Sequence, residues 1–148
     1  MTTVPPPRRE IIVDADPDLA FAVFTERIGE WWPLCAFSVH GAGATVAFVD
    51  RRLGSTIVES SPGAADAVWG TVTRWDPPDS VAFTWHPGKG ADEASQVSVA
   101  FEAADGKTLV RLEHTGWEIF ADPVAAREEY DHGWPAVLDD YAAVVATG

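Results

Sequence analysis

Two side chains, His114 and Glu59, could supply acid–base chemistry to an apolar interior. His114 alternates with Leu112 in a run of β-type residues, so its imidazole falls on the face that we assign to the interior, where it could orient a ligand or transfer a proton. Glu59 shares a strand face with Ile57 and could act as the second titratable group. An inward histidine is more often a satisfied structural group, and Glu59 could be solvated or could pair with an arginine such as Arg74. We therefore favour structural roles for both and leave the catalytic alternative open.

Other catalytic and metal-binding patterns have no support in the sequence. The 4 histidines show no HxxxH or HxH spacing and no pairing with a cysteine, so we predict no metal site. The glycines occur without GxGxxG, GK[ST] or GxSxG patterns, so we predict no nucleotide cofactor and no serine-hydrolase chemistry. The single cysteine, Cys35, has apolar neighbours and no matching histidine, which indicates a buried thiol in a reducing compartment. The sequence thus predicts a protein without a cofactor.

Length and charge narrow the class of protein. At 148 residues the chain has the size of one domain, which we place at residues 1–148 with a flexible lead at 1–7. The formal net charge of −13 argues against nucleic acid and anionic membrane surfaces as partners. The sequence shows neither an apolar run long enough to span a membrane nor a secretory leader, so we predict a cytoplasmic protein.

The first third of the chain predicts a strand and a helix. Alternating residues indicate a strand over Arg8–Asp14, and Asp16 before a proline is typical of a helix N-cap. Gly29 is the expected end of this helix. Of the adjacent Trp31 and Trp32, we expect one to cover the interior and the other to pack sideways or stay partly exposed.

The middle of the chain reads as strands joined by short turns. Short turns between successive strands imply an antiparallel meander, and with the first strand the sheet has seven strands, too many to stay flat. The fold class is therefore α+β, with a sheet that curls around a packed element. The six further strand predictions are Ala44–Val49, Ser55–Ser60, Val68–Trp75, Val81–His86, Gln96–Glu102 and Leu109–Thr115.

A long helix is predicted from Asp122 to Thr147, and it is the element around which the sheet would curl. Asp122 supplies the N-cap, and apolar residues recur at spacings of three and four. Gly133 and Pro135 interrupt this pattern, so we expect either a kink or two abutting helices. The apolar stripe consists of Tyr130, Trp134, Val137, Leu138, Tyr141 and Val145.

Four motifs, taken in order, resemble a known family. They are IGEWWP at residues 28–33, WGxVxxWDPP at 69–78, FTW at 83–85 and HGWxxxL at 132–138. Together with the element order they resemble the AHSA1-like (activator of Hsp90 ATPase homologue 1-like) proteins of the START/Bet v 1-like SRPBCC superfamily. The resemblance implies a helix-grip fold with an apolar cavity between the sheet and the last helix. Roles in this superfamily range from binding of lipids and small molecules to cyclase or dehydratase chemistry and co-chaperone activity.

From these observations we predict that the protein binds a hydrophobic or amphipathic small molecule in that cavity. The alternatives are a cyclase- or dehydratase-type enzyme that uses the cavity histidine and glutamate, and a co-chaperone-like interaction module with a chaperone partner. A homodimer also stays open. The predicted cavity residues are Trp32, Glu59, Phe83, Trp85, Val99, Phe101, Leu112, His114, Trp117, Tyr130, Trp134 and Tyr141.

Overall fold

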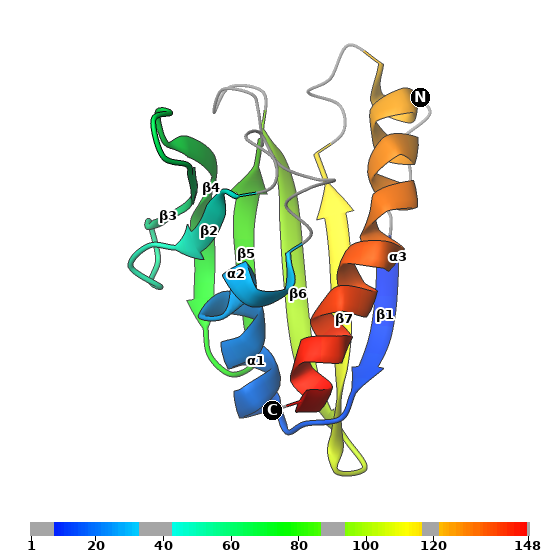
Figure 1. Cartoon of the computed structure of the whole chain (residues 1–148). Coiled ribbons are helices and arrows are strands. Elements are labelled where there is room, and N and C mark those ends of the chain that lie inside the picture. The colour runs from blue at the N-terminus through cyan, green and yellow to red at the C-terminus, as the bar shows by residue number, and fades with distance from the viewer. Residues whose placement is uncertain (1–7, 33–42, 87–93, 117–121, 148) are drawn as a thin grey trace.

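The computed structural model describes residues 8–32, 43–86, 94–116 and 122–147 (Figure 1). The strands begin and end within about two residues of the predicted bounds. The elements are β1 (Arg8–Val13), α1 (Pro17–Thr25), α2 (Ile28–Trp31), β2 (Thr45–Phe48), β3 (Thr56–Ser60), β4 (Ala67–Asp76), β5 (Ser80–Trp85), β6 (Ser95–Ala104), β7 (Lys107–Thr115) and α3 (Pro123–Thr147).

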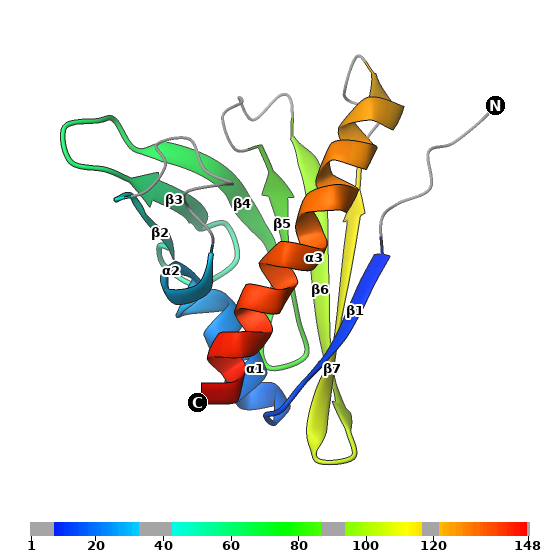
Figure 2. The same cartoon turned by 45° about the vertical axis from the view of Figure 1, so that its right-hand side comes forward.

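The seven strands form one antiparallel sheet in the order β1-β7-β6-β5-β4-β3-β2. Strands β2 to β7 form the predicted meander, and β1 joins it at the β7 edge, where Arg8 faces Glu113 and Val13 faces Thr108. The register shifts between Ile57 and Val58 in the β3–β4 pair and again within the β4–β5 pair. Such bulges bend a strand and increase its twist, and the sheet curls accordingly (Figures 1 and 2). The predicted α+β helix-grip architecture is therefore confirmed.

Alternation along the strands correctly predicted which face is buried. Successive β residues point to opposite faces, so one correctly placed residue fixes the rest of its strand. Every strand residue that we assigned to the interior is less than about a twentieth exposed. These residues are Val81, Phe83, Trp85, Val97, Val99, Phe101, Val110, Leu112 and His114.

Gly70 allows β4 and β5 to approach closely. A Cβ at this position would lie 1.7 Å from the carbonyl oxygen of Thr84, a distance that no side chain can occupy. The Thr84 hydroxyl meanwhile accepts a hydrogen bond of 2.9 Å from the backbone amide of Thr71. Gly70 thus lets the two strands approach each other next to the buried Trp69.

Helix α3 runs diagonally across the concave side of the sheet, and its C-terminal end lies beside α1 (Figure 2). Asp122 caps it by accepting a hydrogen bond of 3.1 Å from the amide of Ala125, as predicted. Pro135 lies inside this single helix, so the alternative of two abutting helices was wrong: one lost backbone bond does not end a helix whose apolar stripe is packed against a sheet. The buried part of the stripe comprises Trp134, Val137, Leu138, Tyr141 and Val145.

Helix α1 begins as predicted but ends early. Asp16 accepts a hydrogen bond of 2.9 Å from the amide of Leu19. The helix ends at Thr25, and the predicted stop, Gly29, lies instead inside the single turn of α2. The cause is Arg27, whose φ of −112° and ψ of 25° depart from helical values and separate the two helices. None of the described helices is long and apolar enough to span a membrane.

Candidate ligand-binding site

Four buried tryptophans meet between the sheet and α3, and we call Trp32, Trp69, Trp85 and Trp134 the tryptophan cluster. Trp85 is its centre: its ring centroid lies 5.5 Å from that of Trp32, 5.6 Å from that of Trp69 and 6.0 Å from that of Trp134. Phe83 adds a further ring at 5.5 Å from Trp85. Strands β4 and β5, helix α3 and the end of α2 therefore each supply part of one aromatic wall.

Trp31 and Trp32 are both buried, so of the two expected alternatives for the second ring, sideways packing or partial exposure, partial exposure was wrong. Trp31 ends the one-turn helix α2, and Trp32 caps it with extended backbone at φ −68° and ψ 127°, so the chain turns sharply between the two rings. Because the helix ends between these two residues, adjacent positions can both reach the interior. The ring centroids of the pair lie 5.7 Å apart.

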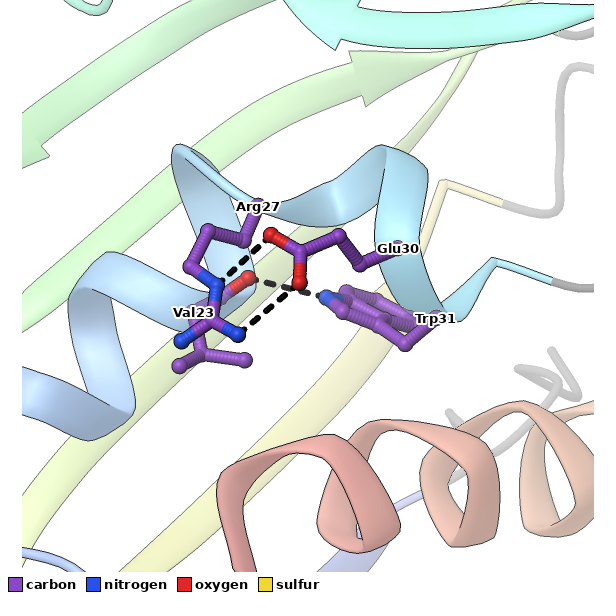
Figure 3. A network of polar contacts seen from close by, with 4 residues as sticks. All are labelled: Val23, Arg27, Glu30 and Trp31. Carbon is purple, nitrogen blue, oxygen red and sulfur yellow. Dashed lines mark hydrogen bonds and ion pairs between the residues drawn. The ribbon is translucent and has the colours of Figure 1, made fainter. Parts of the chain in front are cut away.

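Polar contacts hold α2 against α1 (Figure 3). The indole nitrogen Nε1 of Trp31 donates a hydrogen bond of 2.9 Å to the carbonyl of Val23, which closes the end of α1. Arg27 donates from Nε and Nη2 to the two carboxylate oxygens of Glu30 at 2.6 and 2.8 Å. This hydrogen bonding lowers the pKa of Glu30 and raises that of Arg27. The two helices thus form a fixed elbow that places Trp32 over the sheet.

His114 lies within a chain of hydrogen bonds that determines its tautomer. Trp134 Nε1 donates to His114 Nδ1 at 3.1 Å, so Nδ1 must be unprotonated and the ring proton must lie on Nε2. His114 Nε2 is 2.6 Å from Ser95 Oγ and therefore donates to it. Ser95 Oγ in turn donates to the carbonyl of Trp85 at 3.2 Å. A single direction of donation satisfies all three contacts.

This arrangement keeps His114 neutral. Burial lowers the pKa of its imidazole to about 3 from the ordinary 6.5, because the charged form loses its hydration. Both ring nitrogens are already engaged, one as acceptor and one as donor. The geometry therefore favours the structural role over the catalytic one for His114.

Glu59 is a fully buried carboxylate on β3. Its Oε1 accepts a hydrogen bond of 3.0 Å from Trp69 Nε1, and its burial rules out the solvated alternative. Arg74 is exposed, because the β4–β5 register shift between Val72 and Arg74 breaks the alternation of β4 and sends Arg74 outward. Strands β4, β5 and β6 lie between Glu59 and His114 in the sheet, and the tryptophan cluster bridges them.

The indole donor of Trp85 differs from those of its neighbours. The indole nitrogens of two other cluster members, Trp69 and Trp134, each donate to a defined acceptor, as does that of Trp31 outside the cluster. Trp85 is only 2% exposed, and its buried Nε1 has no hydrogen-bond partner. Within the described part of the chain, the centre of the aromatic wall thus carries an unsatisfied N–H group.

The other predicted site residues lie outside the tryptophan cluster. Phe101 and Tyr141 pack against Phe24 of α1, at centroid distances of 5.8 and 5.4 Å, and so lie apart from Trp85. Tyr141 also donates from its hydroxyl to the Ala20 carbonyl at 2.7 Å, and burial raises its pKa. Val99 and Leu112 are buried on β6 and β7. The predicted site residues Trp117 and the side chain of Tyr130 fall outside the described residues.

Sequence reasoning missed two residues of the site, Trp69 and Ser95. Trp69 carries a usable signal, since it shares a strand with Val72 and belongs to a motif already noted, but we did not assign its face. Ser95 precedes the predicted strand Gln96–Glu102 by one residue, so its hydroxyl was not considered. Its role appears only when β6 and β7 pair and bring it beside His114.

A depression of about 360 Å³ lies on β1 and β7. Four of the charged side chains that line it form ion pairs, with Arg8 Nε 3.0 Å from Glu113 and Arg111 Nε 3.8 Å from Glu10. This surface is polar and open, which does not suit an apolar ligand. Among the residues described, no group of three or more acidic, histidine or cysteine side chains could hold a metal ion.

Comparison with known proteins shows one consistent likeness. The family model described as Activator of Hsp90 ATPase homolog 1-like protein matches residues 14–146. The solved Aha1 dimer from Colwellia psychrerythraea is 17% identical, with a TM-score of 0.71 and 97% of each chain covered. A Bacillus halodurans protein is also 17% identical, with a TM-score of 0.69, covering 98% of this chain and 99% of its own. No curated protein matches significantly in sequence.

A further solved structure has higher identity. It is an anthrahydroquino-gamma-pyrone synthase, Txn09, solved as a complex, and it is 27% identical with a TM-score of 0.62. The alignment covers 95% of this chain and 97% of that protein. The likeness therefore extends over nearly the whole of both chains.

Proposed function

Because the chain belongs to the Activator of Hsp90 ATPase homolog 1-like family, we propose that it binds a hydrophobic or amphipathic small molecule between the sheet and α3. The observation that carries this proposal is the tryptophan cluster on the inner side of the sheet. An aromatic wall with a few placed polar groups is typical of small-molecule sites. Here the polar groups are Glu59, Ser95 and His114.

The first test is native mass spectrometry of the protein purified without added ligand, followed by titration with fluorene, an apolar aromatic probe. Binding is read from quenching of the intrinsic tryptophan fluorescence. Val97→Phe enlarges a buried residue that faces Phe83 and His114 across the neighbouring strands, so it should occupy ligand space and weaken fluorene binding. Val68→Phe makes the same change on the outer face of β4, where Val68 is 42% exposed, and should leave binding unchanged.

Equal binding by both variants and the unchanged protein would place the probe outside the interior and contradict the proposal. Overpacking of Val97 costs roughly 1 to 3 kcal/mol of stability, so the comparison is made well below the unfolding temperature of each variant. A loss of affinity confined to Val97→Phe supports an interior site.

The second candidate is an enzyme of cyclase or dehydratase type, which the 27% identity to a synthase favours. Since His114 has both ring nitrogens engaged, the acid–base role in this alternative falls on the buried carboxylate of Glu59. The test uses 2′-hydroxychalcone, whose cyclisation to flavanone changes its absorbance. Turnover that Glu59→Gln abolishes while binding persists would support the enzyme, and binding without turnover would support the binder.

Further predictions concern the assembly and setting of the protein. A cytoplasmic location, one domain over residues 1–148, a homodimer and a chaperone partner belong to the proposal. The similar protein from Colwellia psychrerythraea was solved as a dimer, and at 17% identity it shows the fold alone. Light scattering coupled to size-exclusion chromatography would distinguish a monomer from a dimer.

A further inference from the structure

We propose that the indole N–H of Trp85 is the polar anchor of the bound ligand, which is therefore a neutral aromatic compound with a hydrogen-bond acceptor, such as an aromatic ketone or a quinone. This inference rests on the proposed function, because it names the ligand class of the same interior site. Its basis is a donor that the protein itself leaves without an acceptor.

Buried tryptophan N–H groups usually find an acceptor, and a buried donor without one is unfavourable. Here the neighbouring indoles follow the rule: Trp69 donates to Glu59, and Trp134 donates to His114. Trp85 lies between these two tryptophans and is more than nine-tenths buried. Bulk water therefore does not reach its N–H group. A bound molecule with an oxygen acceptor would satisfy it.

Three acceptors beside the tryptophan cluster already accept other hydrogen bonds. His114 Nδ1 accepts from Trp134, and the Trp85 carbonyl accepts from Ser95. Oε1 of Glu59 accepts from Trp69. Because none of the described residues accepts from Trp85 Nε1, a bound molecule would supply its acceptor.

The surroundings of Trp85 also decide the charge and shape of this ligand. The rings around it come from Trp32, Trp69, Phe83 and Trp134, and such rings favour a flat aromatic body. Burial of an anion requires a cation or several donors, whereas Trp85 offers a single N–H and the carboxylate of Glu59 already lies beside the cluster, bonded to Trp69. A carbonyl oxygen thus fits better than a carboxylate.

The test compares 9-fluorenone with fluorene, two probes of nearly equal size of which the first alone has a carbonyl. The unchanged protein should bind fluorenone more tightly, by about fivefold for one hydrogen bond. Trp85→Phe keeps an aromatic ring but removes the donor, so it should bind the two probes with equal affinity, whatever the smaller ring does to the affinity for each. The matched control is Trp31→Phe, which removes an indole that already donates to Val23 and should preserve the preference.

A second measurement uses the unchanged protein, so that it holds even if Trp85→Phe does not fold. Nitrogen-15 labelling of the 7 tryptophans gives separate indole signals, and fluorenone should shift one of them downfield while fluorene does not. Binding of both probes with equal affinity and no such shift would overturn the inference and leave the proposed function standing. Failure of both probes to bind would overturn the proposed function and the inference together.

Discussion

The neutral state of His114 predicts a loss of stability in mild acid. Its imidazole is buried, and desolvation lowers its pKa to about 3 from 6.5. The unfolded chain exposes the ring and binds a proton near pH 6.5, whereas the folded protein excludes that proton until about pH 3. The contribution of His114 is therefore fully present above pH 6.5 and is lost progressively as the pH falls toward 3.

The size of this effect follows from the difference in protonation. At pH 5 the unfolded imidazole is almost fully protonated and the folded one is neutral, so each pH unit below 6.5 removes about 1.4 kcal/mol of stability. Between pH 7 and pH 5 the free energy of unfolding should therefore fall by about 2 kcal/mol through His114 alone. Other groups add their own pH dependence, so the comparison needs a variant without this imidazole.

The assay is urea unfolding at pH 7 and at pH 5, followed by tryptophan fluorescence and by circular dichroism. His114→Gln should be less stable at pH 7 and should lose about 2 kcal/mol less than the unchanged protein on moving to pH 5. Ser95→Ala is the matched control: it removes the hydrogen bond to His114 but not the burial that lowers the pKa, so its pH dependence should persist. An unaltered pH dependence in His114→Gln would refute a buried neutral imidazole.

Three further substitutions test the packing. Trp134→Ala should cost about 3 to 5 kcal/mol in urea unfolding, and a cost below about 1 kcal/mol would contradict its place between α3 and the sheet. Tyr141→Phe should cost about 1 to 2 kcal/mol, because it leaves the Ala20 carbonyl without its buried donor; an unchanged melting temperature would argue against this bond. Gly70→Ala should cost more than about 2 kcal/mol, since its methyl group meets the Thr84 carbonyl, and a stable, unshifted variant would show that the strands lie further apart.

The sequence allowed the sheet and its buried face to be predicted because those features depend on local patterns. Val97, Val99 and Phe101 alternate with polar residues, and a strand has only two faces, so one assignment settles all three. The long helix was equally predictable, because Asp122 marks its start and its stripe repeats at the helical period. The sequence could not show whether the helix continues through Pro135 or breaks there, because its continuation depends on packing against the sheet.

The polar details of the site depend on contacts that no local pattern encodes. The acceptor of Trp69 is Glu59, which lies ten residues earlier on the adjacent strand. The two side chains meet where the register of β3 and β4 shifts. The partner of His114 is Ser95, which required the pairing of β6 and β7. The unsatisfied donor of Trp85 is the least predictable of these features, because it is a property of every neighbour at once.

The pairing of β1 with β7 has a consequence for the synthesis of the protein. Strand β1 is made before its partner β7, so its open edge must stay free of other chains until β7 has been made. The hydrogen bond from Tyr141 to Ala20 joins positions 121 residues apart, so the docking of α1 against α3 comes even later. Folding of this sheet therefore cannot finish during translation of its first half, and nascent chains that stall before α3 leave Trp32, Trp69 and Trp85 without the helix that covers them.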